Sequence, residues 1–313
     1  MKNILSYYYS LHPNEVHYIN GRYFFVYMDS KYVFEVFKRP LSDVDSIYKI
    51  NRQMIQRNIL VHEIILNNDK KILTFVNNTP YILMEIFVNE KIRITLSELC
   101  HINNGSINIE SDNILNRNDW VNLWEIKIDY IESQINEVGK KYPSLSNYAN
   151  YYIGLAENAI FYVRNANKIE DLDFKSVCHK RINYYDEYYT LYNPTEYIYD
   201  YRFRDACEYI KSAFFNGQDT YSILDEYFRN NILSYKEALL FYGRLLYPSY
   251  FFDMYDDIIN NNLDEKLIEK IILRTNEYEI FLFNVYLLLS RLYNRYIPPV
   301  DWIIKRSFNQ TSS

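Results

Sequence analysis

The order of patterns between residues 147 and 215 constrains the fold of this chain more than any other feature. It begins with a helix, because residues 147–163 place apolar side chains at helical spacing. We expect this helix to end near residue 166, where the pattern stops. One face of it should be buried against other helices, and that face carries Tyr148, Tyr152, Leu155, Ala159 and Val163.

Three further patterns follow this helix in a fixed order. Residues 177–181 contain a Cys-His pair and predict a turn, and residues 196–203 predict a short strand. Arg204-Asp205 then opens a second helix that we expect to reach residue 215. Helix, Cys-His turn, strand and Arg-Asp helix start is the layout of the catalytic half of a kinase-like phosphotransferase.

The first 89 residues predict a small β-rich lobe. Asn20-Gly21 lies between apolar runs and is a strong hairpin signal, because both turn positions require positive φ. A third strand is expected at residues 32–37, and Ser42 is a candidate cap for a helix reaching about residue 58. A second hairpin over residues 64–76 and a last strand over 81–88 complete the prediction.

Residues 90–313 predict a larger, mostly helical lobe. Thr95 can cap one helix and Asp119 a longer one that ends near Gly139, with a polar loop at residues 102–118 between them. Pro248 should end a later helix, and Pro298-Pro299 should end the packed region. The fold class is therefore α+β, with two lobes. Further helices are expected at residues 204–215, 220–229, 234–247 and 275–293.

Four of these segments together resemble a known family, the YutH-type spore coat-associated proteins. The resemblance covers roughly residues 144–302 and rests on residues 152–160, 178–181, 199–205 and 243–248. This family is similar to the wider CotS group, and the resemblance implies a protein-kinase-like fold of the aminoglycoside-phosphotransferase type.

Phosphate binding is the part of kinase chemistry that this sequence matches least. Kinases cover the nucleotide phosphates with a glycine-rich loop and place a lysine on the third strand. The loop position here is the tight Asn20-Gly21 hairpin, and the whole chain has 6 glycines. Lys31 and Lys38 flank the predicted third strand, where a solvated surface position is the simplest interpretation for each.

The resemblance also assigns the degenerate kinase-like site. Active relatives place a catalytic Asp two residues after the histidine that corresponds to His179, and Arg181 stands there in this chain. A guanidinium is a permanent cation and cannot accept a proton, so we expect no catalytic residue. Asp186 and Asp200 match the metal-ligand positions, as possible Mg²⁺ ligands or as solvated carboxylates. We expect no cofactor: neither ATP nor Mg²⁺ should bind.

Arg204 and Asp205 are predicted to act as a structural anchor. A carboxylate in the first turn of a helix can cap that helix. In the kinase-like arrangement that the resemblance implies, Asp205 instead turns back to hold the backbone of the turn containing Cys178 and His179.

Composition and scattered motifs exclude several other classes. Net charge is −6, which does not match the basic footprint of a nucleic-acid-binding protein. Cys100, Cys178 and Cys207 lack disulfide or zinc spacing, and no hydrolase motif occurs. The first residues predict no signal peptide, and the most apolar run, residues 280–289, is too short to span a bilayer.

The resemblance implies a non-catalytic, pseudokinase-like spore coat-associated protein that takes part in coat assembly. It would be made in the mother-cell cytoplasm, move to the spore coat and bind other coat proteins, without nucleic acid or a transmembrane segment. Two alternatives stay open: an active small-molecule phosphotransferase of the aminoglycoside or choline kinase type, and a pseudokinase that still binds a nucleotide or partner in its cleft. The 35 tyrosines indicate either AT-rich coding and packing or oxidative cross-linking.

Overall fold

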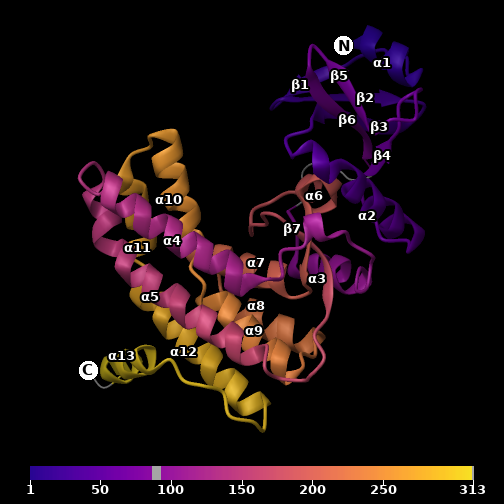
Figure 1. Ribbon diagram of the computed structural model, residues 1–313. Coiled ribbons are helices and arrows are strands. Elements are labelled where there is room, and N and C mark those ends of the chain that lie inside the picture. Colours follow the sequence, from indigo (N-terminus) through magenta and orange to yellow (C-terminus); the bar gives the residue numbers. More distant parts are fainter. Residues whose placement is uncertain (87–92, 312–313) are drawn as a thin grey trace. The chain divides into compact units, whose positions relative to one another are not determined.

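The computed structural model describes residues 1–86 and 93–311 of the chain (Figure 1). These residues form two compact units. The first unit contains residues 1–118 and 174–205, and the second contains residues 119–173 and 206–313. The predicted lobe boundary between residues 89 and 90 lies outside the described residues.

The first unit is built on an antiparallel sheet. Its strands follow the order β1-β2-β3-β6-β4, and β5 also pairs with β6. The β1–β2 hairpin is confirmed, since Asn20 and Gly21 have φ angles of 50° and 82°. The strands are β1 (His17–Ile19), β2 (Arg22–Tyr27), β3 (Ser30–Val36), β4 (Glu63–Ile65), β5 (Leu73–Val76) and β6 (Thr79–Ile86).

The predicted hairpin over residues 64–76 is wrong. Strands β4 and β5 both pair with β6, with Ile64 opposite Met84 and Leu73 opposite Ile82. The tight hairpin joins β5 to β6 instead, through Asn77-Asn78, whose φ angles are 49° and 63°. Asparagine tolerates this left-handed conformation, so the Asn-Asn pair was an available turn signal. The last two residues of the strand predicted at 81–88 lie outside the described residues.

The two faces of this sheet have different coverings. Helix α1 (Lys2–Tyr9) covers one face, where Leu5 packs with Phe25 and Phe34 in an apolar core. Side chains alternate along a strand, so the opposite face of β2 and β3 carries Arg22, Phe24 and Glu35. That second face positions the candidate site.

Two α-helices and two 3₁₀ turns also belong to the first unit. Thr95 and Glu98 form the capping box of α3 (Leu96–Gly105), which confirms Thr95 as a cap. Ser42 does not cap the next helix, because it lies within a 3₁₀ turn, η1 (Leu41–Asp43), that precedes α2. The region predicted as a loop at 102–118 begins later, since α3 continues through Gly105. The remaining elements are α2 (Val44–Gln56) and η2 (Asn113–Leu115).

A second, two-stranded sheet contains Cys178 and His179, which the sequence predicted to lie in a turn. Strands β7 (Lys175–His179) and β8 (Tyr197–Tyr201) are antiparallel, with Cys178 opposite Ile198 and His179 opposite Tyr197. The prediction of a turn at residues 177–181 is therefore wrong for Cys178 and His179, which pair in the strand. Between the strands lie α6 (Tyr188–Tyr192) and η3 (Pro194–Glu196).

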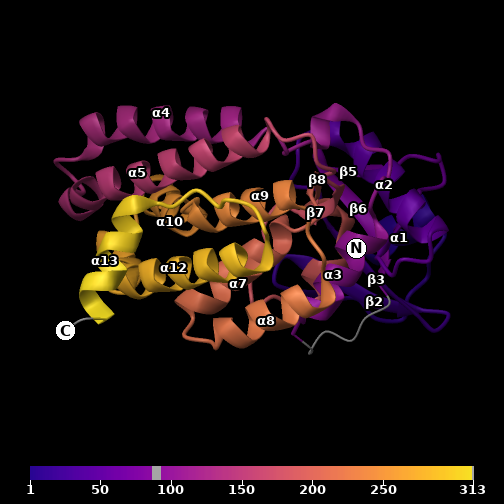
Figure 2. The same cartoon turned by 90° about the horizontal axis from the view of Figure 1, so that it is seen from below.

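The second unit is helical, and α5 packs between α4 and α9 (Figure 2). Asp119 caps α4 as predicted, and the helix ends before Gly139. Helix α7 starts at Arg204 in the first unit and continues into the second. The helices are α4 (Trp120–Val138), α5 (Pro143–Ala166), α7 (Arg204–Phe215), α8 (Thr220–Asn230), α9 (Tyr235–Leu246), α10 (Ser249–Asn261), η4 (Glu265–Ile268), α11 (Glu269–Ile272), α12 (Thr275–Leu292) and α13 (Asp301–Thr311).

The predicted apolar face of α5 is buried except at its start. Tyr152, Leu155, Ala159 and Val163 are buried, but Tyr148 is 42% exposed. Gly243 of α9 approaches α5 at Ala159 and Val163. Tyr148 lies about 16 Å along the helix from Ala159, at 1.5 Å per residue. The helical pattern therefore identifies the buried face of α5 correctly, but it does not show how far along α5 the contact with α9 extends.

Four helices were not predicted from the sequence: α6, α10, α11 and α13. Pro248 ends α9 as expected, but it also occupies the N-cap position of α10, because a proline lacks only an N–H that a helix start does not use. Within residues 1–86 and 93–311, no helix combines the length and apolar character needed to cross a bilayer.

Candidate functional site

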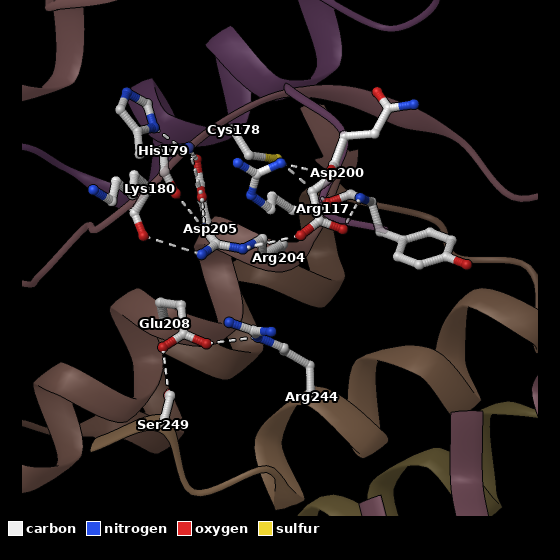
Figure 3. Close-up of polar contacts among 12 residues, drawn as sticks. Arg117, Cys178, His179, Lys180, Asp200, Arg204, Asp205, Glu208, Arg244 and Ser249 are labelled. Carbon is white, nitrogen blue, oxygen red and sulfur yellow. Dashed lines mark hydrogen bonds and ion pairs between the residues drawn. The ribbon is translucent and has the colours of Figure 1, made fainter. Parts of the chain in front are cut away.

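Strands β7 and β8 and the start of α7 bring four of the predicted site residues together (Figure 3). They are His179 at the end of β7, Asp200 in β8, and Arg204 and Asp205 in the first turn of α7. We call them the His179–Asp205 cluster. All four are buried, and Asp200 and Asp205 are fully inaccessible to solvent.

Asp205 holds the end of β7 through its carboxylate. The backbone N–H of His179 donates to both carboxylate oxygens, at 3.1 and 3.0 Å. The side-chain amide of Asn103 donates to Oδ2 at 3.2 Å, and the Arg204 guanidinium lies 3.1 Å from Oδ1. Hydrogen bonds to an ionised acceptor are among the stronger ones in proteins, so this carboxylate fixes helix α7 to β7.

The His179 imidazole contacts an acceptor at each nitrogen. Its Nδ1 lies 2.7 Å from Asp205 Oδ2, and its Nε2 lies 2.8 Å from the Leu191 carbonyl. Burial by itself lowers the pKa of the ring, but the charge and hydrogen bond of Asp205 outweigh it, and the net pKa of His179 is raised. Because only a doubly protonated ring can donate to both acceptors, the imidazolium form fits this geometry.

The same pairing acts on the carboxyl. Burial raises the pKa of Asp205, and the opposing charges and hydrogen bonds of His179 and Arg204 bring the net pKa below its usual value. Asp205 is therefore ionised, and its charge is balanced by the cations beside it.

Arg204 connects the remaining members of the cluster. Its Nε lies 3.1 Å from Asp200 Oδ2, and its Nη2 donates to the Lys180 carbonyl at 3.2 Å. It also donates to the carbonyl of His179. Asp200 accepts the N–H of Tyr201 through its other oxygen at 2.8 Å. The carboxylate predicted to match a kinase metal ligand is thus engaged with a guanidinium and a backbone amide.

The other two predicted site residues lie after β7. Arg181 is exposed, and its guanidinium donates to the carbonyl of Lys180 at 3.1 Å. Asp186 is partly buried and accepts the N–H of Asn183 at 2.7 Å, so its carboxylate closes a local turn. Burial raises the pKa of Asp186 above its usual value.

Sequence reasoning missed an ion pair on the sheet, of which the carboxylate is buried. Glu35, 7% exposed, is the inward-facing residue near the end of the third strand, where protein kinases place their phosphate-binding lysine. Arg22 lies 2.7 Å from Glu35 Oε2, and the Asn193 amide donates to Oε1 at 3.2 Å. Lys31 and Lys38 are both exposed. The signal that could have identified Glu35 is its place as the one charged residue within the apolar run of residues 32–37.

Tyr189 of α6 packs directly under the same face of the sheet. The Arg22 guanidinium stacks 4.2 Å from the centre of its ring, and the Phe24 ring lies 6.2 Å away, edge to face. The His62 ring is 5.1 Å from it on another side. Burial lowers the pKa of His62 to about 3, so His62 is neutral. The sheet and α6 are therefore joined by side-chain packing across this face.

The segment at residues 243–248 forms a second buried ionic group, in the second unit (Figure 3). Arg244 of α9 pairs with Glu208 of α7 at 2.7 Å, and Glu208 also accepts the Ser249 hydroxyl at 2.7 Å. Lys211 pairs with Glu208 at 2.7 Å. Arg244 stacks on aromatic rings, the nearest of which is Trp120 at 5.1 Å. We call Glu208, Lys211 and Arg244 the Glu208 cluster.

Lys211 is fully enclosed in this cluster. Its ammonium donates to Ser249 Oγ at 2.6 Å and to the carbonyls of Arg244 and Tyr247 at 3.2 and 3.1 Å. Burial lowers its pKa to about 8, although Glu208 acts in the opposite direction. The ammonium ties the end of α9 to the start of α10.

Metal ions in proteins are commonly held by His, Cys, Asp and Glu side chains, and the structure describes residues 1–86 and 93–311. Among those residues, no group of three or more His, Cys, Asp or Glu side chains could hold a metal ion. Within the same residues, Cys100, Cys178 and Cys207 form no disulfide bond.

The antiparallel sheet with its β1–β2 hairpin, the β7–β8 pair and the helical second unit define a two-lobed kinase-like α+β fold. Solved structures agree. An aminoglycoside phosphotransferase from Alicyclobacillus acidocaldarius matches with a TM-score of 0.63 and 9% identity, covering 89% of this chain and 93% of that one. A spectinomycin phosphotransferase matches with a TM-score of 0.58 and 13% identity, covering 92% and 97%.

The family model described as "Spore coat putative kinase YutH" matches residues 2–285. The chain belongs to this family. The endospore coat-associated protein YutH of Bacillus subtilis is 26% identical to it over 210 residues, which is 60% of this chain and 62% of that relative. The match thus spans less than two thirds of the relative's length.

Proposed function

We propose that this protein is a non-catalytic member of its family that contributes to endospore coat assembly by binding other coat proteins. The observation that carries the proposal is the packing of Tyr189 and Arg22 beneath the sheet, beside the buried carboxylate of Glu35. In a kinase, this face of strands β1–β3 covers the nucleotide. Here it is occupied by the chain's own side chains.

Charge supports the same proposal. A phosphate-binding lysine on β3 attracts the nucleotide, whereas Glu35 places a carboxylate at the inward position of that strand. Two like charges at close range in a partly buried site repel by several kcal/mol. Arg22 does not serve as a substitute cation, because Glu35 already pairs with it.

The positions that would perform the chemistry are altered as well. Arg181 stands where a kinase has its catalytic base, and loss of a general base typically reduces the rate by about 10²–10⁴-fold. Asp200 is paired with Arg204 within the His179–Asp205 cluster. A Mg²⁺ ion would have to compete with that guanidinium for the same carboxylate oxygen.

A binding and turnover assay tests the catalytic part of the proposal. We expect the melting temperature to be unchanged by ATP with Mg²⁺, because a ligand that binds only the native state raises it by mass action. Labelled ATP with aminoglycosides, choline and sugars should give no product above buffer. Turnover that disappears in an Asp200→Asn variant would establish the active small-molecule phosphotransferase instead, and turnover that persists in that variant would be a contaminant.

The coat assembly part needs a cellular test. A fluorescent fusion should appear first in the mother-cell cytoplasm and then around the forespore, and extraction of spores should recover it with the coat fraction. An Arg181→Ala variant should localise identically, because the proposal gives this position no catalytic role. Uniform fluorescence in the mother cell throughout sporulation would contradict the proposed assembly.

A further inference from the structure

The C-terminal helix α13 packs over a buried carboxylate of the second unit. Glu279 of α12 is 2% exposed. Its Oε1 accepts hydrogen bonds from the Tyr151 hydroxyl of α5 and from the Arg306 guanidinium of α13, each at 2.7 Å. The Trp302 ring of α13 lies 5.7 Å from the Tyr151 ring, edge to face. We call Tyr151 and Glu279 the α13-binding site.

The pairing between this site and α13 is incomplete. The other carboxylate oxygen of Glu279, Oε2, is buried and has no hydrogen-bond partner among the described residues. A guanidinium can donate to both oxygens of a carboxylate at once, but Arg306 pairs with Oε1 alone, and its side chain is 54% exposed. A buried acceptor without a partner costs free energy. The α13-binding site can therefore bind an arginine more strongly than it binds Arg306 in this arrangement.

The segment that joins α12 to α13 restricts where α13 can lie. It consists of residues 293–300, which form neither helix nor strand and run back along α12 (Figure 2). The Tyr235 hydroxyl of α9 donates to the Tyr296 carbonyl at 2.6 Å, so the first half of this segment is fixed. Residues 297–300 alone then lead to α13, and two of them are prolines with a fixed φ. This short connection limits how α13 approaches Glu279 of the same chain.

Few apolar contacts hold α13 in place. Among the side chains of residues 301–306, Ile303 is the buried one, at 1% exposed. A segment with few buried apolar side chains opens locally at a lower free energy than the rest of a fold. Helix α13 can therefore separate from the α13-binding site while α5 and α12 stay folded.

We propose that the α13-binding site also binds α13 of a second copy of this chain, so that exchange of this helix joins two copies. The exchanged helix brings the same two partners, Arg306 for Glu279 and Trp302 for Tyr151. Its connecting segment arrives from the other copy, which frees Arg306 to pair with both oxygens of Glu279. Exchange of an identical element is a low-cost route to a dimer, because its contacts already exist within one chain.

The side chains of α13 identify the occupant. Trp302 and Arg306 are four residues apart and share one side of the helix, with the guanidinium 5.7 Å from the centre of the Trp302 ring. A ligand needs such an aromatic–arginine pair to contact Tyr151 and Glu279 together, and α13 carries it. A free anion would be repelled by Glu279. The inference does not depend on whether the chain lacks kinase activity or binds coat proteins, because only this chain takes part.

A fluorescent peptide of residues 297–311 tests binding to the full chain. Arg306→Glu places a second carboxylate against Glu279, so α13 of that chain should leave the site and the peptide should bind there. Anisotropy should show saturable binding at least about 10-fold tighter than to the unaltered chain, in which the tethered α13 competes at a high effective concentration. A peptide that itself carries Arg306→Glu should bind neither chain.

Two further variants locate the binding. Lys305→Glu is the matched control, because Lys305 is an exposed neighbour of Arg306 and the change in net charge is the same. That chain should bind the peptide as weakly as the unaltered chain does. Adding Glu279→Gln to Arg306→Glu keeps the shape of the site and removes its charge, and should weaken peptide binding by about 10-fold. Equal affinities of the Arg306→Glu and Lys305→Glu chains would overturn the proposal.

Cross-linking shows whether two full-length copies exchange the helix. Arg306→Lys keeps the cation and provides an amine that a carbodiimide can couple to the Glu279 carboxylate. A mixture of nitrogen-15-labelled and unlabelled chains should yield cross-linked peptides with one labelled and one unlabelled half. Cross-links found only within one isotopic form would mean that α13 binds its own chain alone, which contradicts the exchange.

Discussion

Two buried ionic groups among the described residues, the His179–Asp205 cluster and the Glu208 cluster, differ in how burial and pairing affect their pKa values. In the His179–Asp205 cluster of the first unit, His179 and Arg204 balance Asp200 and Asp205, and the pKa values of His179 and Asp205 both move toward the charged form. In the Glu208 cluster of the second unit, the pKa of Lys211 falls to about 8, toward the neutral form.

This difference in the direction of the pKa shifts shows how the charges of each cluster affect stability. A charged side chain contributes to stability when the attraction of its partners exceeds the cost of removing it from water, and its pKa then shifts to favour the charged form. When the pKa instead shifts to favour the neutral form, the side chain costs stability for as long as it stays charged. The first cluster therefore fixes the start of α7 to the end of β7. In the second, burial of the Lys211 ammonium outweighs its pairing with Glu208, so the charged form of this lysine costs stability there.

The largest effect should come from removing the centre of the first cluster. Asp205→Ala removes the carboxylate that His179, Arg204 and the His179 amide share, and breaking a buried ion pair in this way typically costs about 3–5 kcal/mol. Hydrogen exchange of peptides from β7, followed by mass spectrometry, should show that loss as faster opening.

Asp205→Asn provides the intermediate case. It retains an acceptor of the same size without the charge, so its effect should lie between those of the native protein and Asp205→Ala. Equal exchange in β7 for all three proteins would mean that Asp205 is only a helix cap.

The next effect concerns the apolar core of the second unit. Leu155→Ala removes a buried side chain from the α5 face, and such truncations cost about 2–5 kcal/mol. Tyr148→Ala, on the same helix but 42% exposed, should change the free energy of unfolding much less. Urea melts followed by exchange in α5 peptides would measure both. A similar cost for the two variants would mean that burial along α5 does not follow the structure.

The sequence predicted the elements of this fold better than their contacts. Period and capping signals located α4, α5 and the β1–β2 hairpin, because these depend on residues close together in the chain. The pairing of β4 and β5 with β6 was missed, since it depends on strands distant in sequence. The start of α10 was missed because Pro248 was interpreted only as the end of a helix.

In the candidate site, too, residues could be identified from the sequence more readily than the contacts between distant segments. His179, Asp200, Arg204 and Asp205 could be named from motif order, and the structure places them together. Glu35, Tyr189 and Asn193 could not be linked from the sequence, because they meet only when β3 and the segment after β7 face each other. The Glu208 cluster was missed for a similar reason, since no local pattern joins helix α7 to α9.

The response to alkaline pH should distinguish the two clusters. The pKa of Lys211 is about 8 in the folded chain, whereas the ordinary value of 10.5 applies in the unfolded chain. Between these two pH values the unfolded state therefore binds more protons than the folded state. Stability of the second unit should then rise with pH over that range, by up to roughly 3 kcal/mol for this group. Deprotonation of tyrosines in the unfolded state opposes the rise above about pH 10, so the useful range is pH 8–9.5.

The first cluster should respond in the opposite direction. The pKa of His179 is raised on folding, so its contribution is complete below about pH 6.5 and disappears as pH rises through the folded value. The pKa of Asp205 is lowered on folding, so its contribution is present above about pH 4 and is lost as pH falls through the folded value. Exchange rates in β7 and α9 peptides across pH, corrected for intrinsic exchange, measure both trends. Lys211→Met should remove the rise in α9 and leave β7 unchanged.

The smallest effects should come from the two capping boxes, one in each unit. Thr95 caps α3 with Glu98, and Ser234 caps α9 with Glu237. Replacing either cap by alanine should cost about 1 kcal/mol. The cost should be larger for Ser234→Ala, because the Ser234 hydroxyl also donates to the Leu172 carbonyl at 2.6 Å. Local exchange in α3 and α9 would measure the two costs, and a larger loss at Thr95 would contradict this ranking.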